Sequence, residues 1–238
     1  MNSDNKTPRL LGAAFLIVFI ASMLSGSLLS SAIGSGSISD ILVNISNNLT
    51  LMRISILVEL VTSIGIVALA MLLYVVFHRQ YQIIARVALG WWLAEAITLA
   101  VSKIGAYALI PLSQEYVQAG APDSSYFQTL GDFLYYGFDR QGWAIHMLFF
   151  CLGGILWYYL FYRSKYIPRV LSGWGLVAVS LVSINILLVL FDRSIDLQMI
   201  MLAPYLVFEA LIGPWLMIKG ISDGSEIMKG EPALDSVT

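Results

Sequence analysis

Six long apolar segments are the feature that most constrains what this chain can fold into. A helix needs roughly 20 predominantly apolar residues to cross the hydrocarbon core of a bilayer, where its backbone groups must bond to one another. Six segments meet this requirement, and they run approximately over residues 10–33, 54–77, 83–109, 143–162, 170–191 and 199–221. The sequence therefore predicts an all-α, polytopic membrane protein with six transmembrane helices.

The composition agrees with this prediction and excludes other classes. Hydrophobic residues make up 58% of the chain and charged residues only 12%, which is far from the balance of a soluble domain. A formal net charge of −2 excludes the basic surface that nucleic-acid binding requires, so we expect no nucleic-acid partner. Cys151 is the only cysteine, which excludes an intramolecular disulfide and a cysteine cluster for a metal.

The charge distribution predicts the orientation and the domain limits. Nine of the thirteen basic residues lie in segments that share one side of the membrane under this threading. Because basic residues concentrate in cytosolic segments, we expect both termini in the cytosol of a bacterial inner (plasma) membrane. Residues 1–9 are then a cytosolic tail, residues 10–221 a single transmembrane domain, and residues 222–238 a disordered cytosolic tail. A cleaved first helix is the alternative, but it would leave five segments and place one terminus against the charge pattern.

Two further segments on the outer side show helical periodicity. Apolar residues recur at helical spacing over 38–52 and over 126–138, with polar residues opposite in the first segment and tyrosines interleaved in the second. These patterns predict two amphipathic helices at the outer surface. They either connect distant helices along the interface or form a lid over an outward-opening cavity, and the sequence leaves both readings open.

Four stretches together resemble a known family: "RLLGAAFLI" from Arg9, "RISILVEL" from Arg53, "YRSKYIPRVLSGWG" from Tyr162 and "FEALIGPWLMIKG" from Phe208. Their order and spacing are similar to those of bacterial six-helix membrane proteins grouped as domain of unknown function 4386. The resemblance extends from about Arg9 to Gly220. It implies a fold and a membrane location, and it carries no catalytic residues over to this chain.

Three carboxylates lie inside predicted spans, namely Glu59, Glu95 and Glu209. An ionisable side chain near the bilayer centre costs at least about 2.5 to 3.5 kcal/mol, so each needs a partner or a polar interior. We expect them to share an outer-half cavity with His146. Other predicted lining residues are Trp91, Trp92 and Tyr205, and a basic outer rim is predicted from Arg53, Lys103 and Arg140. Hydrogen bonds between helices, without any cavity, are the competing explanation.

Three functions remain open from the sequence. The first is binding of a membrane lipid or another small amphiphile, in a carrier, sensor or accessory subunit. The second is an intramembrane lipid-modifying enzyme with Glu59 or Glu95 as general base and His146 or Arg140 assisting. The third is a structural subunit of a membrane complex. We expect no cofactor and no metal, because no zinc-protease, nucleophile-elbow or phosphate-binding motif is present. The oligomeric state is left open.

Overall fold

The computed structural model describes residues 6–123, 126–192 and 197–221. The predicted C-terminal tail, 222–238, lies outside these ranges, whereas residues 6–9 of the predicted N-terminal tail already belong to the first helix. No strand occurs within the described ranges. The helices are α1 (Lys6–Ile33), α2 (Ile38–Asn47), α3 (Leu49–Phe77), α4 (Gln82–Gln118), α5 (Tyr126–Asp132), the π-helical segment η2 (Phe133–Arg140), α6 (Gln141–Ser164), α7 (Arg169–Phe191) and α8 (Gln198–Lys219).

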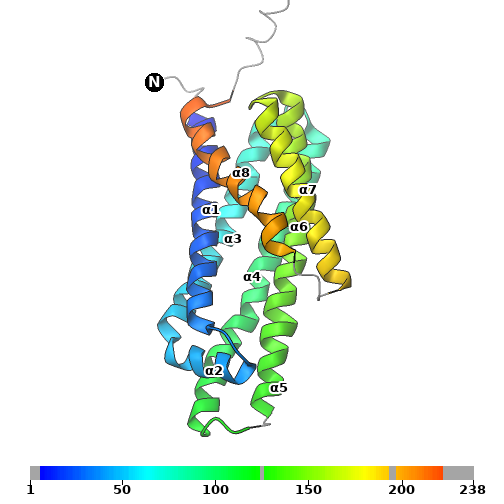
Figure 1. The fold of residues 1–238 in the computed structure, drawn as a ribbon. Helices are drawn as coiled ribbons and strands as arrows, with labels where there is room; N and C mark the ends of the chain where they lie inside the picture. The colour runs from blue at the N-terminus through cyan, green and yellow to red at the C-terminus, as the bar shows by residue number, and fades with distance from the viewer. Residues whose placement is uncertain (1–5, 124–125, 193–196, 222–238) are drawn as a thin grey trace, which may run out of the picture.

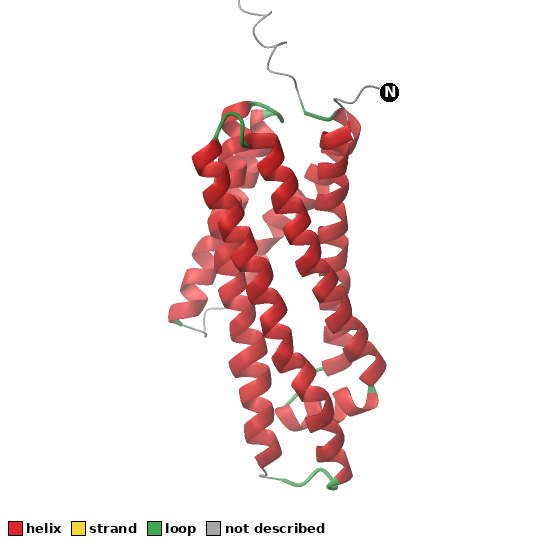
Figure 2. Cartoon of the chain, turned by 180° about the vertical axis from the view of Figure 1, so that it is seen from behind, coloured by secondary structure: helices red, strands yellow, loops and turns green. Residues whose placement is uncertain are grey.

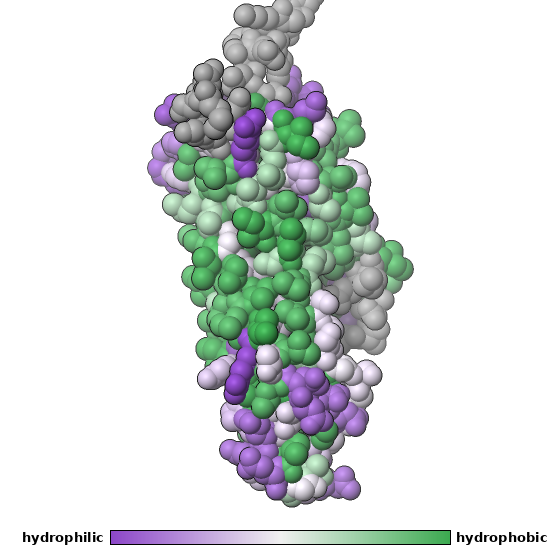
Figure 3. Space-filling view, turned by 90° about the vertical axis from the view of Figure 1, so that its left-hand side faces the viewer, coloured by the Kyte–Doolittle hydropathy of each residue, from purple (hydrophilic) through white to green (hydrophobic). Residues whose placement is uncertain are grey.

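Six of these elements are long and apolar enough to cross a membrane, which confirms the predicted fold class. They are α1, α3, α4, the continuous rod formed by α5, η2 and α6, and then α7 and α8. The protein is therefore an integral, multi-pass membrane protein. Figure 3 agrees, because hydrophobic side chains cover much of one face while hydrophilic ones gather toward its lower end.

The six spans form a closed ring. Each neighbouring pair in the order α1, α3, α4, α6, α7, α8 is in contact, and α8 returns to α1. Successive spans run in opposite directions (Figures 1 and 2). We call the end of the bundle that holds Lys6 and Lys219 the terminal end, and the opposite end, which holds α2 and α5, the distal end. Both described chain ends thus lie on one side of the bundle (Figure 1).

The spans differ in length, and this difference shapes the distal end. At 1.5 Å per residue, α4 with 37 residues is about 55 Å long, whereas α7 with 23 residues is about 35 Å long. The ends of α4 and of the α5–η2–α6 rod therefore continue beyond the distal ends of α7 and α8 (Figure 1). Together with α2 they form a distal head around a second apolar core, which includes Leu42, Ile45, Met52, Leu109 and Tyr116.

Local sequence explains why α1 ends and α2 begins where they do. Gly34 follows the last residue of α1 with φ of 63°, a conformation that only glycine adopts at little cost. Ser37 then caps α2: its hydroxyl and its backbone N–H both donate to Asp40 Oδ2, and its hydroxyl oxygen accepts from Asp40 N. The two hydrogen bonds from Ser37 lower the pKa of the Asp40 carboxyl below its ordinary value, and the bond from the hydroxyl contributes more than the bond from the backbone N–H.

The terminal half of the ring is packed with large apolar side chains. Trp157, Phe161 and Phe77 are fully buried in the main core. Helices α1 and α8 approach each other closely at Gly12, which has no side chain to hold them apart. A Cβ added to Gly12 would lie 2.6 Å from the backbone oxygen of Gly213. Bulkier residues at this crossing would force the two helices apart.

The two predicted amphipathic segments take different forms. α2 buries Ile38, Ile41, Leu42 and Ile45 on one face, as the periodicity indicated. The second segment is no separate surface helix, since α5 and η2 continue directly into α6. π-Helical turns rotate successive side chains differently from α-helical ones. In this rod Tyr135 and Asp139 are buried while Phe133 is 62% exposed.

Candidate functional site

An elongated cavity lies inside the ring of helices. Its volume is about 310 Å³, and residues of α1, α3, α4, η2, α6 and α8 line it. Along α1 the lining extends from Val18 to Ile33, which corresponds to about 22 Å along the helix axis. None of the residues of α2 or α5 lies on its wall, whereas Asp139 and Arg140 of η2 do. Neither predicted outer segment, 38–52 or 126–138, contributes to the wall, and the two η2 residues that do follow directly after the second segment.

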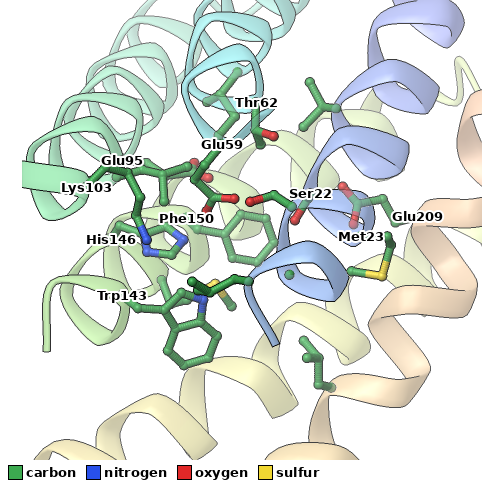
Figure 4. Close-up of a pocket in the computed structure, with 18 of the residues that line it drawn as sticks. Ser22, Met23, Glu59, Thr62, Glu95, Lys103, Trp143, His146, Phe150 and Glu209 are labelled. Carbon is green, nitrogen blue, oxygen red and sulfur yellow. The ribbon is translucent and has the colours of Figure 1, made fainter. Parts of the chain in front are cut away.

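The three predicted carboxylates converge on this cavity from three helices. Glu59 comes from α3, Glu95 from α4 and Glu209 from α8, and all three line it. In Figure 4 the carboxyl groups of Glu59 and Glu209 point toward the centre of the pocket, with Ser22 of α1 between them. Measured along each helix from the terminal end, Glu209 and Glu95 lie about 15 and 20 Å deep and Glu59 about 27 Å.

Two buried groups in the wall have polar atoms without a partner. Glu95 is 4% exposed and its Oε2 makes no hydrogen bond, and His146 is 6% exposed with no hydrogen bond at Nδ1. A buried polar atom that is left unpaired costs about 1 to 3 kcal/mol, and a charged one costs more. A partner outside the protein would remove that cost. Such atoms around a cavity are the features of a polar binding site in an apolar wall.

One buried ion pair borders the cavity. Nζ of Lys103 lies 2.8 Å from Oδ1 of Asp139, and the two side chains are only 8% and 5% exposed. Lys103 was expected at an outer rim and not in a buried pair. The next residue of η2, Arg140, is exposed and donates to the hydroxyl of Tyr135 at 2.9 Å. Its guanidinium also lies over the Tyr135 ring, 5.3 Å from the centroid.

Aromatic side chains fix the inner wall. Nε1 of Trp92 donates to the backbone oxygen of Phe150 at 3.1 Å, which holds the indole between α4 and α6. The hydroxyls of Tyr205 and Tyr158 lie 2.8 Å apart and are hydrogen-bonded. These bonds use polar atoms of Trp92 and Tyr205 within the protein, so these two residues add mainly apolar surface to the wall.

The structure brings together eight of the ten residues that the sequence singled out. Those lining the cavity are Glu59, Glu95, His146, Glu209, Trp92, Tyr205, Lys103 and Arg140. Trp91 and Arg53 are not on its wall. Adjacent residues of a helix point about 100° apart, so Trp91 does not face the cavity that Trp92 lines. Trp91 instead stacks on Phe149 with ring centroids 5.8 Å apart. Arg53 is exposed at the start of α3.

Sequence reasoning missed several lining residues. Asp139 and Trp143 line the cavity but were not among the predicted residues. Ser22, Ser25 and Ser30 of α1 were also missed. Their spacing of three to five residues along one face was the available signal, since small polar residues in a membrane helix mark faces that meet protein or water.

The cavity opens at its distal half. Met23, Gly26 and Ser30 of α1 and Arg140 of η2 all line it and are all exposed. They lie on the two sides of the gap between α1 and the η2–α6 rod, which are not neighbours in the ring. Near the terminal end α8 covers this gap, because it runs obliquely from α7 to α1 (Figure 1). The opening is therefore lateral and confined to the distal side of α8.

These features define a polytopic helical membrane protein with a laterally open cavity, whose largely apolar wall carries several polar groups. Among the described residues, no group of three His, Cys, Asp or Glu side chains has the geometry of a metal site. The family model described as Domain of unknown function (DUF4386) matches residues 10–220, and the chain belongs to this family. No curated protein and no solved structure shows a significant match.

Proposed function

We propose that this protein binds a lipid or another small membrane amphiphile in the distal cavity, as a carrier, sensor or accessory subunit and not as an enzyme. The observation that carries this proposal is the lateral opening between α1 and the η2–α6 rod onto a cavity with buried, unpartnered polar atoms. A volume of about 310 Å³ is at the lower end of the range for small-molecule sites, roughly 300 to 1,000 Å³. Such a cavity accommodates a head group or a short chain, with the remainder of the molecule in surrounding lipid.

The walls match the two parts of an amphiphile. Val18, Ile66 and Leu206 supply apolar surface, while Glu59, Glu95 and His146 supply polar groups. An apolar segment gains about 25 cal/mol for each Å² removed from water, but it gains little on transfer from lipid to protein. Selectivity therefore depends on the polar groups, because these find no equivalent partners in the hydrocarbon.

The test is retention of an amphiphile after gentle extraction. Native mass spectrometry of the parent protein should show a bound amphiphile. A Ser22→Trp variant, which fills the cavity from α1, should lose it. Ser27→Trp is the matched control, because Ser27 is exposed on α1 and is not part of the wall. Equal retention in the Ser22→Trp variant and the parent, or no ligand in the parent, would contradict the proposal.

We also infer the orientation and the membrane. With Arg79, Arg86, Arg163 and Arg169 near the terminal end, the positive-inside rule places that end in the cytosol and the cavity opening in the outer leaflet of a bacterial inner membrane. Fusions of a periplasm-active phosphatase and of a cytosol-active fluorescent protein after Gly220 test this orientation. Phosphatase activity of the fusion after Gly220 would contradict this orientation, because it would place the terminal end in the periplasm.

A lipid-modifying enzyme is the second candidate, because Glu59, Glu95 and His146 share one cavity wall. A general base must come within hydrogen-bond reach of the proton that it removes, and a lipid in this cavity would be close to these groups. Incubation in defined lipid separates the two functions. A binding protein returns the lipid unchanged, whereas an enzyme accumulates a product that disappears in Glu95→Gln.

A further inference from the structure

We propose that the ligand of this cavity carries an amine head with N–H donors, seated among Glu59, Glu95 and Glu209. This inference deepens the proposed amphiphile binding and rests on it. It names the chemical class of the head group.

The first argument is the balance of charge-bearing groups in the wall. Lys103 is already paired with Asp139 at 2.8 Å, and Arg140 is exposed and engaged with Tyr135. Within the described residues, no ion pair or hydrogen bond to a protein group involves any of the three glutamates. Apart from the imidazole of His146, whose Nδ1 also lacks a partner, the groups that remain available in the cavity are therefore acidic.

The second argument is the unpartnered Oε2 of Glu95. This carboxyl is 96% buried, lies on the cavity wall and leaves one oxygen without any hydrogen bond. A carboxylate accepts hydrogen bonds at both oxygens, and a carboxyl group that keeps its proton still accepts at one. Glu209 enters from the opposite side of the ring, and Glu59 lies between the two in Figure 4. A donor with several N–H groups in that space would reach more than one of them.

The third argument is the aromatic surface beside the carboxylates. Trp143, Phe150 and Tyr205 line the same cavity. The faces of aromatic rings attract cations, and the attraction is strongest where water is excluded. An ammonium group has three donors and a positive charge, so it fits both the acceptors and the rings. An anionic head would meet three carboxyl groups, and a hydroxyl head would offer a single donor and no charge.

The experiment compares three amphiphiles that differ in head group and share the same twelve-carbon alkyl chain. The protein is reconstituted in nanodiscs of phosphatidylcholine, whose head group has no N–H donor, and its thermal midpoint is followed while dodecylamine, dodecanol or dodecanoate is titrated. Dodecylamine should raise the midpoint in a saturable way, with an apparent affinity about tenfold or more above that of dodecanol. Equal responses to the amine and the alcohol would overturn the inference while leaving amphiphile binding intact. No saturable response to any of the three would contradict amphiphile binding as well.

Variants then locate the head group. Glu95→Gln and Glu209→Gln should lose the preference for dodecylamine and keep the response to dodecanol, which also reports that the cavity is intact. Glu115→Gln is the matched control, because Glu115 is an exposed glutamate on the same helix as Glu95. An undiminished amine preference in both cavity variants would overturn the assignment. If a variant does not fold, displacement of the amine from the parent by dodecanol answers the same question, since a shared site predicts competition.

A second arm identifies the source of the amine. Phosphatidylethanolamine is added to the nanodiscs in place of part of the phosphatidylcholine. A higher midpoint with phosphatidylethanolamine supports a lipid head group as the ligand, and a response to dodecylamine alone supports a free amine. The inference is overturned if phosphatidylethanolamine does not raise the midpoint above that in phosphatidylcholine and dodecylamine does not raise it above that with dodecanol.

Discussion

Removal of Asp139 provides a direct test of how the cavity wall is built. Asp139→Leu leaves Lys103 without its partner, although its side chain is only 8% exposed. Breaking a buried pair costs about 3 to 5 kcal/mol, because the remaining charge stays desolvated. Since this pair borders the cavity, where water can approach the ammonium, we expect the lower value, a loss of about 3 kcal/mol in the free energy of unfolding.

The assay is a double-mutant cycle. Unfolding by sodium dodecyl sulfate in mixed micelles, followed by tryptophan fluorescence, gives the free energy for the parent, Asp139→Leu, Lys103→Met and the double variant. Replacing both members by apolar residues should restore stability to within about 1 kcal/mol of the parent or exceed it. Arg53→Met is the control, because Arg53 is exposed, and it should change stability by no more than about 0.5 kcal/mol. The reasoning is refuted if the double variant is as unstable as Asp139→Leu.

Two further predictions concern the N-terminal cap of α2 and the crossing of α1 and α8. Because the pKa of Asp40 is lowered in the folded protein, its contribution to stability is present above the unfolded value of about 3.9 and is lost as the pH falls through the folded value. The hydrogen-exchange protection factors of α2, which correct for the intrinsic exchange rate at each pH, should therefore fall below about pH 4, and Asp40→Asn should remove this pH dependence. Gly12→Leu would collide with the backbone of Gly213 and Met217, so it should destabilise the bundle by about 1 to 3 kcal/mol in the same unfolding assay, while Gly26→Leu, with open space around its Cβ, should not.

The six spans could be predicted from sequence because the requirement is local. A run of about 20 apolar residues satisfies it without knowledge of any neighbour. The predicted start of the fourth span at residue 143 lies close to the start of α6 at Gln141, but the continuous helical rod begins at Tyr126, which the sequence did not predict. Polar residues such as Asp132 and Asp139 interrupt the apolar run, so the segment was predicted as a separate amphipathic helix and not as part of the span. The π-helical turns at Phe133–Arg140 were not predicted, because the apolar residues over 126–138 were interpreted with α-helical spacing.

The shared cavity was predictable only in outline. Depth along a helix follows from residue number, so the common level of Glu59 and His146 could be deduced from the chain. Which way a side chain faces depends on the rotation of its helix within the ring. Trp91 and Trp92 illustrate this limit, because they are adjacent in sequence and only Trp92 lines the cavity. The pairing of Lys103 with Asp139 could not be predicted for the same reason, and also because the π-helical segment that contains Asp139 was not recognised.

The close crossing of α1 and α8 at Gly12 and Gly213 has a consequence for exchange with the bilayer. These two helices are held backbone to backbone near one membrane surface and diverge toward the other (Figure 1). Passage of a bound molecule toward the surface where they are joined would require their separation against tightly packed main chain. Under the proposed binding function, a bundle joined in this way would exchange its ligand with the leaflet at the distal end and would not move it to the opposite leaflet.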